Sequence, residues 1–180
     1  MGTVNLKTAS GGSVILSPAN TAVDVTITVP ASNATMAVNG PAFSAYSTNA
    51  QSISSGTTVK IQLNTEVFDT ANAFDSTTNY RFTPLIAGYY QVNGQVALNG
   101  GATGQARAMI YKNGSTYQEG SSIPNNTITG AETTISTIIY LNGSTDYIEL
   151  YCYLYTGAGA LTLQNSSAVN YFSGAMVRSA

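Results

Sequence analysis

Apolar and polar residues alternate with period two along most of this chain. The pattern is clearest over residues 23–29, 59–63, 90–98 and 106–111. Successive side chains of a β-strand point to opposite faces of the sheet, so this alternation predicts half-buried strands. No window of a dozen residues shows a helical apolar stripe with capping residues. We therefore predict an all-β protein.

Turn signals separate the predicted strands at short intervals. Asn-Gly pairs at 113–114 and 142–143 stand between strong strand patterns and predict hairpin or loop tips, because type I′ turns require positive φ at both central residues. The Asn-Gly pair at 93–94 lies inside an alternating run and predicts a bulge or a close backbone approach. Residues 52–58, rich in Ser and Thr, are predicted to form a loop. Many short strands with frequent turns are typical of a sandwich or jelly roll.

A composition boundary falls at Asn39-Gly40-Pro41. We predict a small N-terminal β extension over residues 1–40, with strands at 13–16 and 23–29, and a main domain over residues 41–180. Forty residues rarely bury enough surface to fold alone. The extension must therefore pack on the main domain, on a partner or on copies of itself, and we expect it to act as an attachment segment.

Composition removes several function classes. Only 8% of the 180 residues are charged, whereas Ser, Thr and Asn together number 59. The chain has no His, the commonest general base, and a single Cys, which excludes an internal disulfide and a cysteine-based metal site. Six basic residues and a net charge of −2 give no footprint for nucleic acid, and no apolar run is long enough to insert into a membrane. The first residues also lack the pattern of a secretory signal. We expect a protein that is not an enzyme.

Residues 41–177 carry an ordered series of motifs. They are Pro41-Ala42-Phe43-Ser44-Ala45, Phe68-Asp69, Phe74-Asp75, Tyr80-Arg81-Phe82-Thr83-Pro84 with Gly88-Tyr89-Tyr90, Tyr111-Lys112-Asn113-Gly114, the segment from Leu141 to Leu150, and Tyr171-Phe172-Ser173-Gly174-Ala175. This series resembles the C1q-like globular head of the C1q/TNF superfamily. The resemblance implies a ten-stranded jelly roll over residues 41–180 that forms homotrimers, with aromatic and apolar residues of one sheet at the threefold axis. The sequence departs from the family where Ser144 and Thr145 separate Gly143 from Asp146, and in lacking a collagen-like stalk upstream.

A second resemblance concerns the N-terminal extension. Residues 11–18 and 23–30 are similar to segments of phage tail fibres and other virion appendages. Together the two resemblances imply a homotrimeric structural and adhesive knob of a virion appendage, on a head or tail fibre at the virion surface. Residues 1–40 would contact other virion proteins, and the knob would bind a host-surface glycan or protein multivalently. The alternatives are a carbohydrate-binding module of an extracellular or bacterial cell surface, and a purely architectural decoration protein.

Residues 147–155 hold the candidate ligand or interface residues. Period two places Ile148, Leu150, Cys152 and Leu154 on one face, and Tyr147, Glu149, Tyr151, Tyr153 and Tyr155 on the other. The first face is predicted to enter the core, which makes Cys152 a buried, inert thiol. The tyrosine face has two interpretations. Its rings either cover a neighbouring strand or subunit, which we favour, or form a ligand surface, for example one that stacks on sugars.

Asp69, Asp75 and Asp146 are weak candidates for calcium ligands, since some C1q-like trimers bind this ion. Calcium needs six to eight oxygen ligands, usually with several converging carboxylates, and the sequence contains no looped ligand motif. We favour solvated loop carboxylates and expect no cofactor. Nothing pairs any two carboxylates at a separation suited to glycoside hydrolysis.

Overall fold

The computed structural model describes residues 4–7, 10–11, 13–16, 40–100, 104–121, 123–125, 130–157 and 159–180. The chain separates into two units, residues 1–36 and 37–180. In the first unit β1 (Val4–Lys7) pairs antiparallel with β2 (Ser13–Leu16), which is the strand expected at 13–16. The strand expected at 23–29 lies outside the described residues. The attachment role of residues 1–40 stays a prediction.

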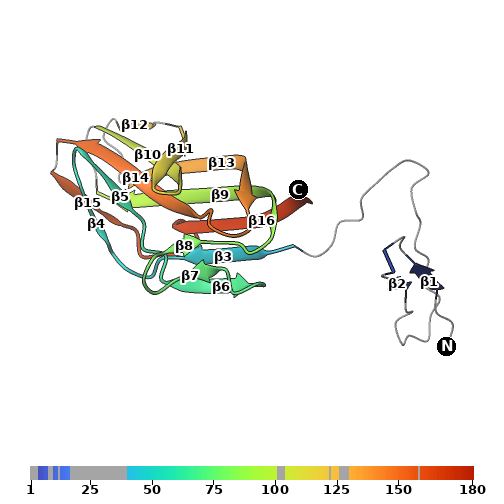
Figure 1. Cartoon of the computed structure of the whole chain (residues 1–180). Helices are drawn as coiled ribbons and strands as arrows, with labels where there is room; N and C mark the ends of the chain where they lie inside the picture. The colour runs from blue at the N-terminus through green and yellow to red at the C-terminus, as the bar shows by residue number, and fades with distance from the viewer. Residues whose placement is uncertain are drawn as a thin grey trace. The chain divides into compact units, whose positions relative to one another are not determined.

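The larger unit contains two antiparallel sheets (Figure 1). In the first, here the β9 sheet, the main strands lie in the order β6 (Thr65–Asp69), β3 (Ala42–Tyr46), β16 (Tyr171–Ser179), β9 (Ala87–Asn99) and β13 (Gly130–Asn142). In the second, here the β14 sheet, the order is β7 (Phe74–Asp75), β8 (Arg81–Phe82), β14 (Ile148–Thr156), β10 (Gly104–Lys112) and β11 (Ser115–Glu119). These ten strands confirm the predicted all-β jelly roll.

Four short strands extend this frame. They are β4 (Ser52–Ser54) and β15 (Ala160–Leu163) in the β9 sheet, and β5 (Thr57–Lys60) and β12 (Ile123–Asn125) in the β14 sheet. The loop expected at 52–58 is therefore wrong. The chain there forms β4 and the start of β5, which turn at Gly56 with φ of 77° and pair with strands from distant parts of the sequence.

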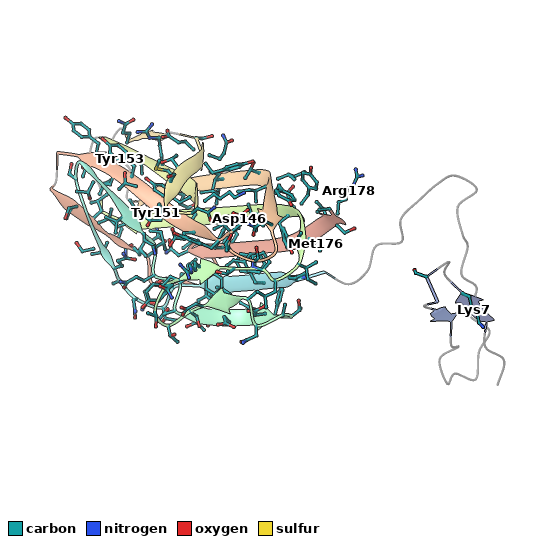
Figure 2. All side chains as sticks on the ribbon, viewed as in Figure 1. Lys7, Asp146, Tyr151, Tyr153, Met176 and Arg178 are labelled. Atoms are coloured by element: carbon teal, nitrogen blue, oxygen red, sulfur yellow. The ribbon has the colours of Figure 1, made fainter. Side chains whose placement is uncertain are left out.

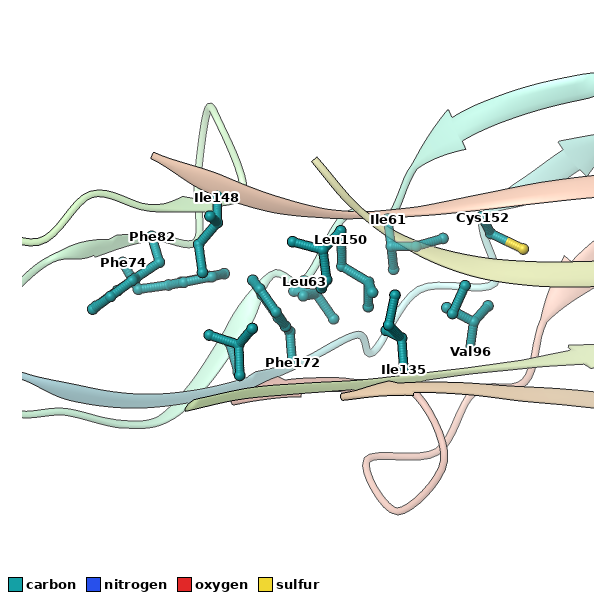
Figure 3. Packing of buried hydrophobic residues seen from close by; sticks show 14 of the residues in the cluster. Ile61, Leu63, Phe74, Phe82, Val96, Ile135, Ile148, Leu150, Cys152 and Phe172 are labelled. Atoms are coloured by element: carbon teal, nitrogen blue, oxygen red, sulfur yellow. The ribbon is translucent and has the colours of Figure 1, made fainter. Parts of the chain in front are cut away.

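The core lies between the two sheets. Figure 3 shows Leu150 and Cys152 extending from β14, and Phe172 and Val96 from the opposite sheet, into one apolar layer. The ring of Phe43 lies at the centre of an aromatic cluster. Its centroid is 4.3 Å from that of Phe82 and 5.1 Å from those of Phe74 and Phe172. Apolar residues of the predicted core face thus meet across the sandwich and exclude water.

One Asn-Gly pair forms a turn between two strands, and another lies inside a strand. Asn113 and Gly114 have φ of 53° and 78° and join β10 to β11, which confirms the predicted hairpin tip. Gly94 instead lies in β9, where both neighbouring ladders keep a continuous register past it, so no bulge occurs there. It is a close approach, because a Cβ at Gly94 would stand 2.6 Å from Leu150 Cδ1 of the facing sheet. In the described part of the chain no helix is long and apolar enough to cross a membrane.

Candidate binding surfaces

The tyrosine face of β14 follows the predicted alternation. Ile148, Leu150, Cys152 and Leu154 are fully buried, whereas Tyr151 and Tyr153 are half-buried on the outer side of the β14 sheet (Figure 2). Tyr155 continues the row and is 58% exposed. The sequence did not indicate how the face is built around these rings, because their neighbours come from β5, β8 and β10.

Most of these rings have a partner on the adjacent strands. The ring of Tyr151 stacks on that of Tyr111, with centroids 3.9 Å apart and an interplanar angle of 21°. Guanidinium groups lie over two other rings, Arg81 over Tyr147 at 4.3 Å and Arg107 over Tyr153 at 4.8 Å. The ammonium group of Lys60 lies 5.9 Å from the Tyr151 ring. Cation–π contacts of this kind are attractive because the ring face carries partial negative charge. One face of each of these three rings is therefore occupied within the molecule.

Charges on this face are also compensated internally. Glu149, placed on the tyrosine face by the sequence, is only 3% exposed and forms an ion pair with Lys60. Arg107 Nη1 donates to Glu119 Oε2 at 2.8 Å. Burial, followed by the nearby Glu149 charge, raises the pKa of Tyr151. We call Tyr147, Tyr151, Tyr153 and Tyr111 with their cationic partners the tyrosine ladder. Its rings contact another ring or a cation, and Lys60 and Arg107 are paired with carboxylates. These contacts between strands stabilise the sheet.

The three calcium candidates each accept hydrogen bonds from groups of the chain. Both carboxylate oxygens of Asp69 accept backbone N–H groups, those of Ala71 and Phe74. Asp75 accepts donors from residues 77–79, chiefly the backbone N–H of Thr78, and these hold its pKa far below the ordinary value. Such N–H groups direct positive hydrogens at the oxygens where a cation would bind. Within the described residues no group of three or more acidic or thiol ligands converges on one point.

Asp146 joins two loops instead of pointing into solvent. It accepts hydrogen bonds from Lys112 Nζ, Asn113 Nδ2 and the backbone N–H of Asn142. The Lys112 hydrogen bond is the main cause that lowers the pKa of this carboxyl group, against the opposing effect of its burial. The solvated loop carboxylate favoured from the sequence is therefore wrong for Asp146, which is 8% exposed.

Cys152 is fully buried, as the alternation predicted. Burial raises the pKa of its thiol to about 12. A thiol reacts as its thiolate, so this side chain is unsuited to nucleophilic chemistry.

A second surface, not predicted from individual residues, lies on the open face of the β9 sheet. Tyr89, Ile138, Tyr140 and Val177 are 44%, 54%, 40% and 52% exposed. The rings of Tyr89 and Tyr140, opposite each other on β9 and β13, lie 5.5 Å apart. A hollow of about 560 Å³ is lined by Tyr89, Ile138, Val177 and the last three residues. We call Tyr89, Ile138, Tyr140 and Val177 the apolar patch. The run Ile138-Ile139-Tyr140-Leu141 was its sequence signal, since four consecutive apolar residues place apolar side chains on both faces of a strand.

Solved structures with the same architecture are numerous. The globular domain of zebrafish complement 1qA superposes with a TM-score of 0.53 and 13% identity over 78% of this chain and 99% of that one. Murine APRIL at pH 5.0 gives 0.57 and 11% over 77% and 99%, and Eiger TNF from S. frugiperda gives 0.55 and 9% over 79% and 94%. The chain has a C1q/TNF-like fold. No family model matches the sequence, and no curated protein matches it. The predicted resemblance is thus confirmed at the level of the fold.

Proposed function

We propose that this C1q/TNF-like domain is a non-enzymatic binding head that assembles as a homotrimer through the open face of the β9 sheet. The apolar patch is the observation that carries the proposal. One face of an antiparallel sheet in a sandwich is normally solvated and polar. Here Tyr89, Ile138, Tyr140 and Val177 leave an apolar, hollowed region on that face, which is typical of a protein interface. The number of copies, three, is the one that the C1q-like motifs imply.

The absence of an enzymatic role is supported by the state of the reactive groups. The chain has no His. Among the described residues, Lys60, Arg107 and Lys112 are each paired with a carboxylate, and the Cys152 thiol is buried with a raised pKa. A general acid or base must be accessible and must exchange protons near neutral pH. The three paired cations and the buried thiol do not meet these requirements.

A trimer gives the proposed head its mode of action. Three identical weak sites on one rigid particle bind a surface far more tightly than one site does, because the second and third contacts form within the same complex. The finer proposal, that the head belongs to a virion appendage, is supported by the resemblance of residues 11–18 and 23–30 to appendage segments. On this proposal, deletion of residues 1–40 abolishes incorporation into the particle.

Absolute mass in solution, measured by light scattering, tests the trimer. The full chain is expected at three times 18.7 kDa. Ile138→Asp places a charge on the apolar patch and is expected to yield the monomer. Tyr155→Asp, at a side chain of similar exposure on the β14 sheet, is the matched control and should keep the trimer. A monomeric full chain, or an Ile138→Asp variant that remains trimeric, contradicts the proposal.

A further inference from the structure

A second exposed apolar surface lies at the opposite edge of the β9 sheet from the apolar patch. Val67 and Phe68 of β6 are 65% and 47% exposed. β6 is the last strand on its side of the sheet, beyond β3, whereas β13 lies beyond β9 on the other side (Figure 1). An exposed apolar edge strand tends to associate with another chain, and proteins normally protect such edges. We call Val67 and Phe68 the edge patch.

A β-bulge turns both side chains of the edge patch toward solvent. The register of β6 on β3 shifts by one residue between Phe68 and Glu66, so Val67 is the extra residue. Neighbouring residues of a regular strand point to opposite faces, whereas a bulge re-aims the side chain of the extra residue. Phe68 lies opposite Ser44, which alternates with buried residues of β3. Phe68 therefore points to the open face of the β9 sheet, as the apolar patch does.

The edge patch and the apolar patch are separate, but they lie at nearly the same height along the strands. One row of paired residues crosses the open face, formed by Phe68, Ser44, Ser173, Asn93 and Ser136. The four polar members of this row separate Phe68 from β13 and its apolar side chains by about 19 Å, four strand spacings. Ile138 of the apolar patch follows Ser136 on the same face of β13, only about 7 Å further along the strand.

The charges beside the two patches have opposite signs. Arg178 lies opposite Tyr89 of the apolar patch, is exposed, and forms no ion pair among the described residues. Glu66 precedes the edge patch and is also exposed; its Oε1 accepts a hydrogen bond from Ser76 Oγ at 2.6 Å, and no cation of the described chain pairs with it. Opposite charges attract across an interface and like charges repel. Each patch is therefore better complemented by the other patch than by a copy of itself.

A closed ring of three copies joined head to tail needs two different contact surfaces on each copy. The apolar patch supplies one of them. Rotation about an axis that runs along the strands keeps the height of every residue, so the apolar patch of one copy meets the edge patch of the next at nearly the same level. We propose that the apolar patch of each protomer docks on the edge patch of its neighbour. This inference rests on the proposed homotrimer and deepens it, since it names the surface that receives the apolar patch.

Two single substitutions and their mixture test this contact by light scattering. Phe68→Asp places a charge in the edge patch and is expected to yield the monomer, as Ile138→Asp does. Tyr155→Asp, at an exposed ring on the β14 sheet, is the matched control and should keep the trimer. An equimolar mixture of the Phe68→Asp and Ile138→Asp chains is expected to form a heterodimer of two times 18.7 kDa. The first variant keeps an intact apolar patch and the second an intact edge patch, so one junction forms and cannot be extended to a trimer.

Amide shifts of an isotope-labelled variant detect a junction too weak for light scattering. The labelled Phe68→Asp chain, at about 0.5 mM, is titrated with the unlabelled Ile138→Asp chain, which populates a contact with a Kd of about 1 mM or below. Shifts are expected at the amides of Ile138, Tyr140 and Val177 in the labelled chain. Unlabelled Phe68→Asp is the control for this titration and should cause no shifts. Dispersed amide signals in the same spectra establish that the variant is folded.

The outcomes separate this contact from the trimer itself. A full chain that is monomeric contradicts both. A Phe68→Asp chain that stays trimeric, while Ile138→Asp is monomeric, contradicts only the docking of the two patches and places copies of the apolar patch against one another around the axis. A mixture that gives neither the heterodimer nor shifts at the apolar patch also overturns the proposal.

Discussion

Replacing Asp146 with alanine is expected to loosen the loops at one edge of the sandwich. The carboxylate accepts hydrogen bonds from Asn113 Nδ2 at 2.7 Å, Lys112 Nζ at 2.8 Å and the Asn142 N–H at 3.1 Å. Asn113 Oδ1 accepts the Tyr147 N–H at 3.0 Å. One side chain thus ties the β10–β11 hairpin to the connection between β13 and β14, and its removal frees both.

The magnitude follows from these three contacts. Hydrogen bonds to a charged group contribute about 1.5–3 kcal/mol each when the partners are buried. The Lys112 side chain is 23% exposed, so water screens the Lys112–Asp146 ion pair. The contribution of this ion pair to the free energy of unfolding is therefore well below that range. The released N–H groups lie at loops and regain water. We expect Asp146→Ala to lower the free energy of unfolding by about 3 kcal/mol, which corresponds to a fall of about 6–12 °C in Tm.

The effect should depend on pH with a definite sign. The pKa of Asp146 in the folded chain lies below the ordinary value of 3.8, mainly because of Lys112. Its stabilising contribution is therefore complete above that ordinary value and is lost as the pH falls through the folded pKa. Thermal unfolding of the wild-type and Asp146→Ala chains should differ by a constant amount from pH 5 to 7 and converge in acid. Asp75, whose pKa is also lowered, is present in both chains and cancels in the difference.

Glu132→Ala, at an exposed carboxylate of β13, provides the control and should unfold at the wild-type temperature. Two results refute the reasoning. An Asp146→Ala chain as stable as the control would show that the three contacts contribute nothing. A difference that persists unchanged below pH 3 would show that the carboxylate charge is not its source. A rise in wild-type Tm on adding calcium that Asp146→Ala lacks would instead assign the residue to a calcium site.

Three further outcomes are expected. Gly143→Ala should destabilise the fold by at least about 2 kcal/mol more than Gly56→Ala in urea unfolding, because both glycines have positive φ but only the first would drive a Cβ into the backbone of β9. The Cys152 thiol should react with Ellman's reagent at pH 8 only in denaturant, because its pKa of about 12 leaves almost no thiolate in the folded chain, and rapid native-state reaction would contradict its burial. A double-mutant cycle of Tyr111→Ala and Tyr151→Ala should show a coupling energy of about 0.5–1.5 kcal/mol, and purely additive effects would refute the stacking.

The features that the sequence could predict are those set by neighbours in the chain. Alternation placed Leu150 and Cys152 in the core, because side-chain direction along a strand depends only on position. Asn113-Gly114 predicted its turn, because the two residues themselves supply the positive φ values. The C1q-like motifs carried the order of strands across the whole domain, which periodicity alone does not specify.

The features that the sequence could not predict depend on pairing between distant segments. Residues 52–58 contain mostly Ser and Thr, with too weak an apolar pattern to indicate strands, and they form β4 and the start of β5 by pairing with β15 and β14. That pairing brings Lys60 beside Glu149 and buries the carboxylate. The apolar patch likewise combines side chains of β9, β13 and β16, which come from distant parts of the sequence.

A binding surface requires groups whose interactions are not already satisfied within the molecule. On the β14 sheet, the rings of the tyrosine ladder contact a ring or a cation, and Lys60 and Arg107 are paired with carboxylates, so a ligand that used these groups would have to displace internal partners. The open face of the β9 sheet differs, because the apolar side chains of its patch remain exposed to water. The apolar patch loses this solvent-exposed area when another copy covers it. The abundance of tyrosine on β14 is therefore a poorer guide to function than the exposed apolar side chains of β9, β13 and β16.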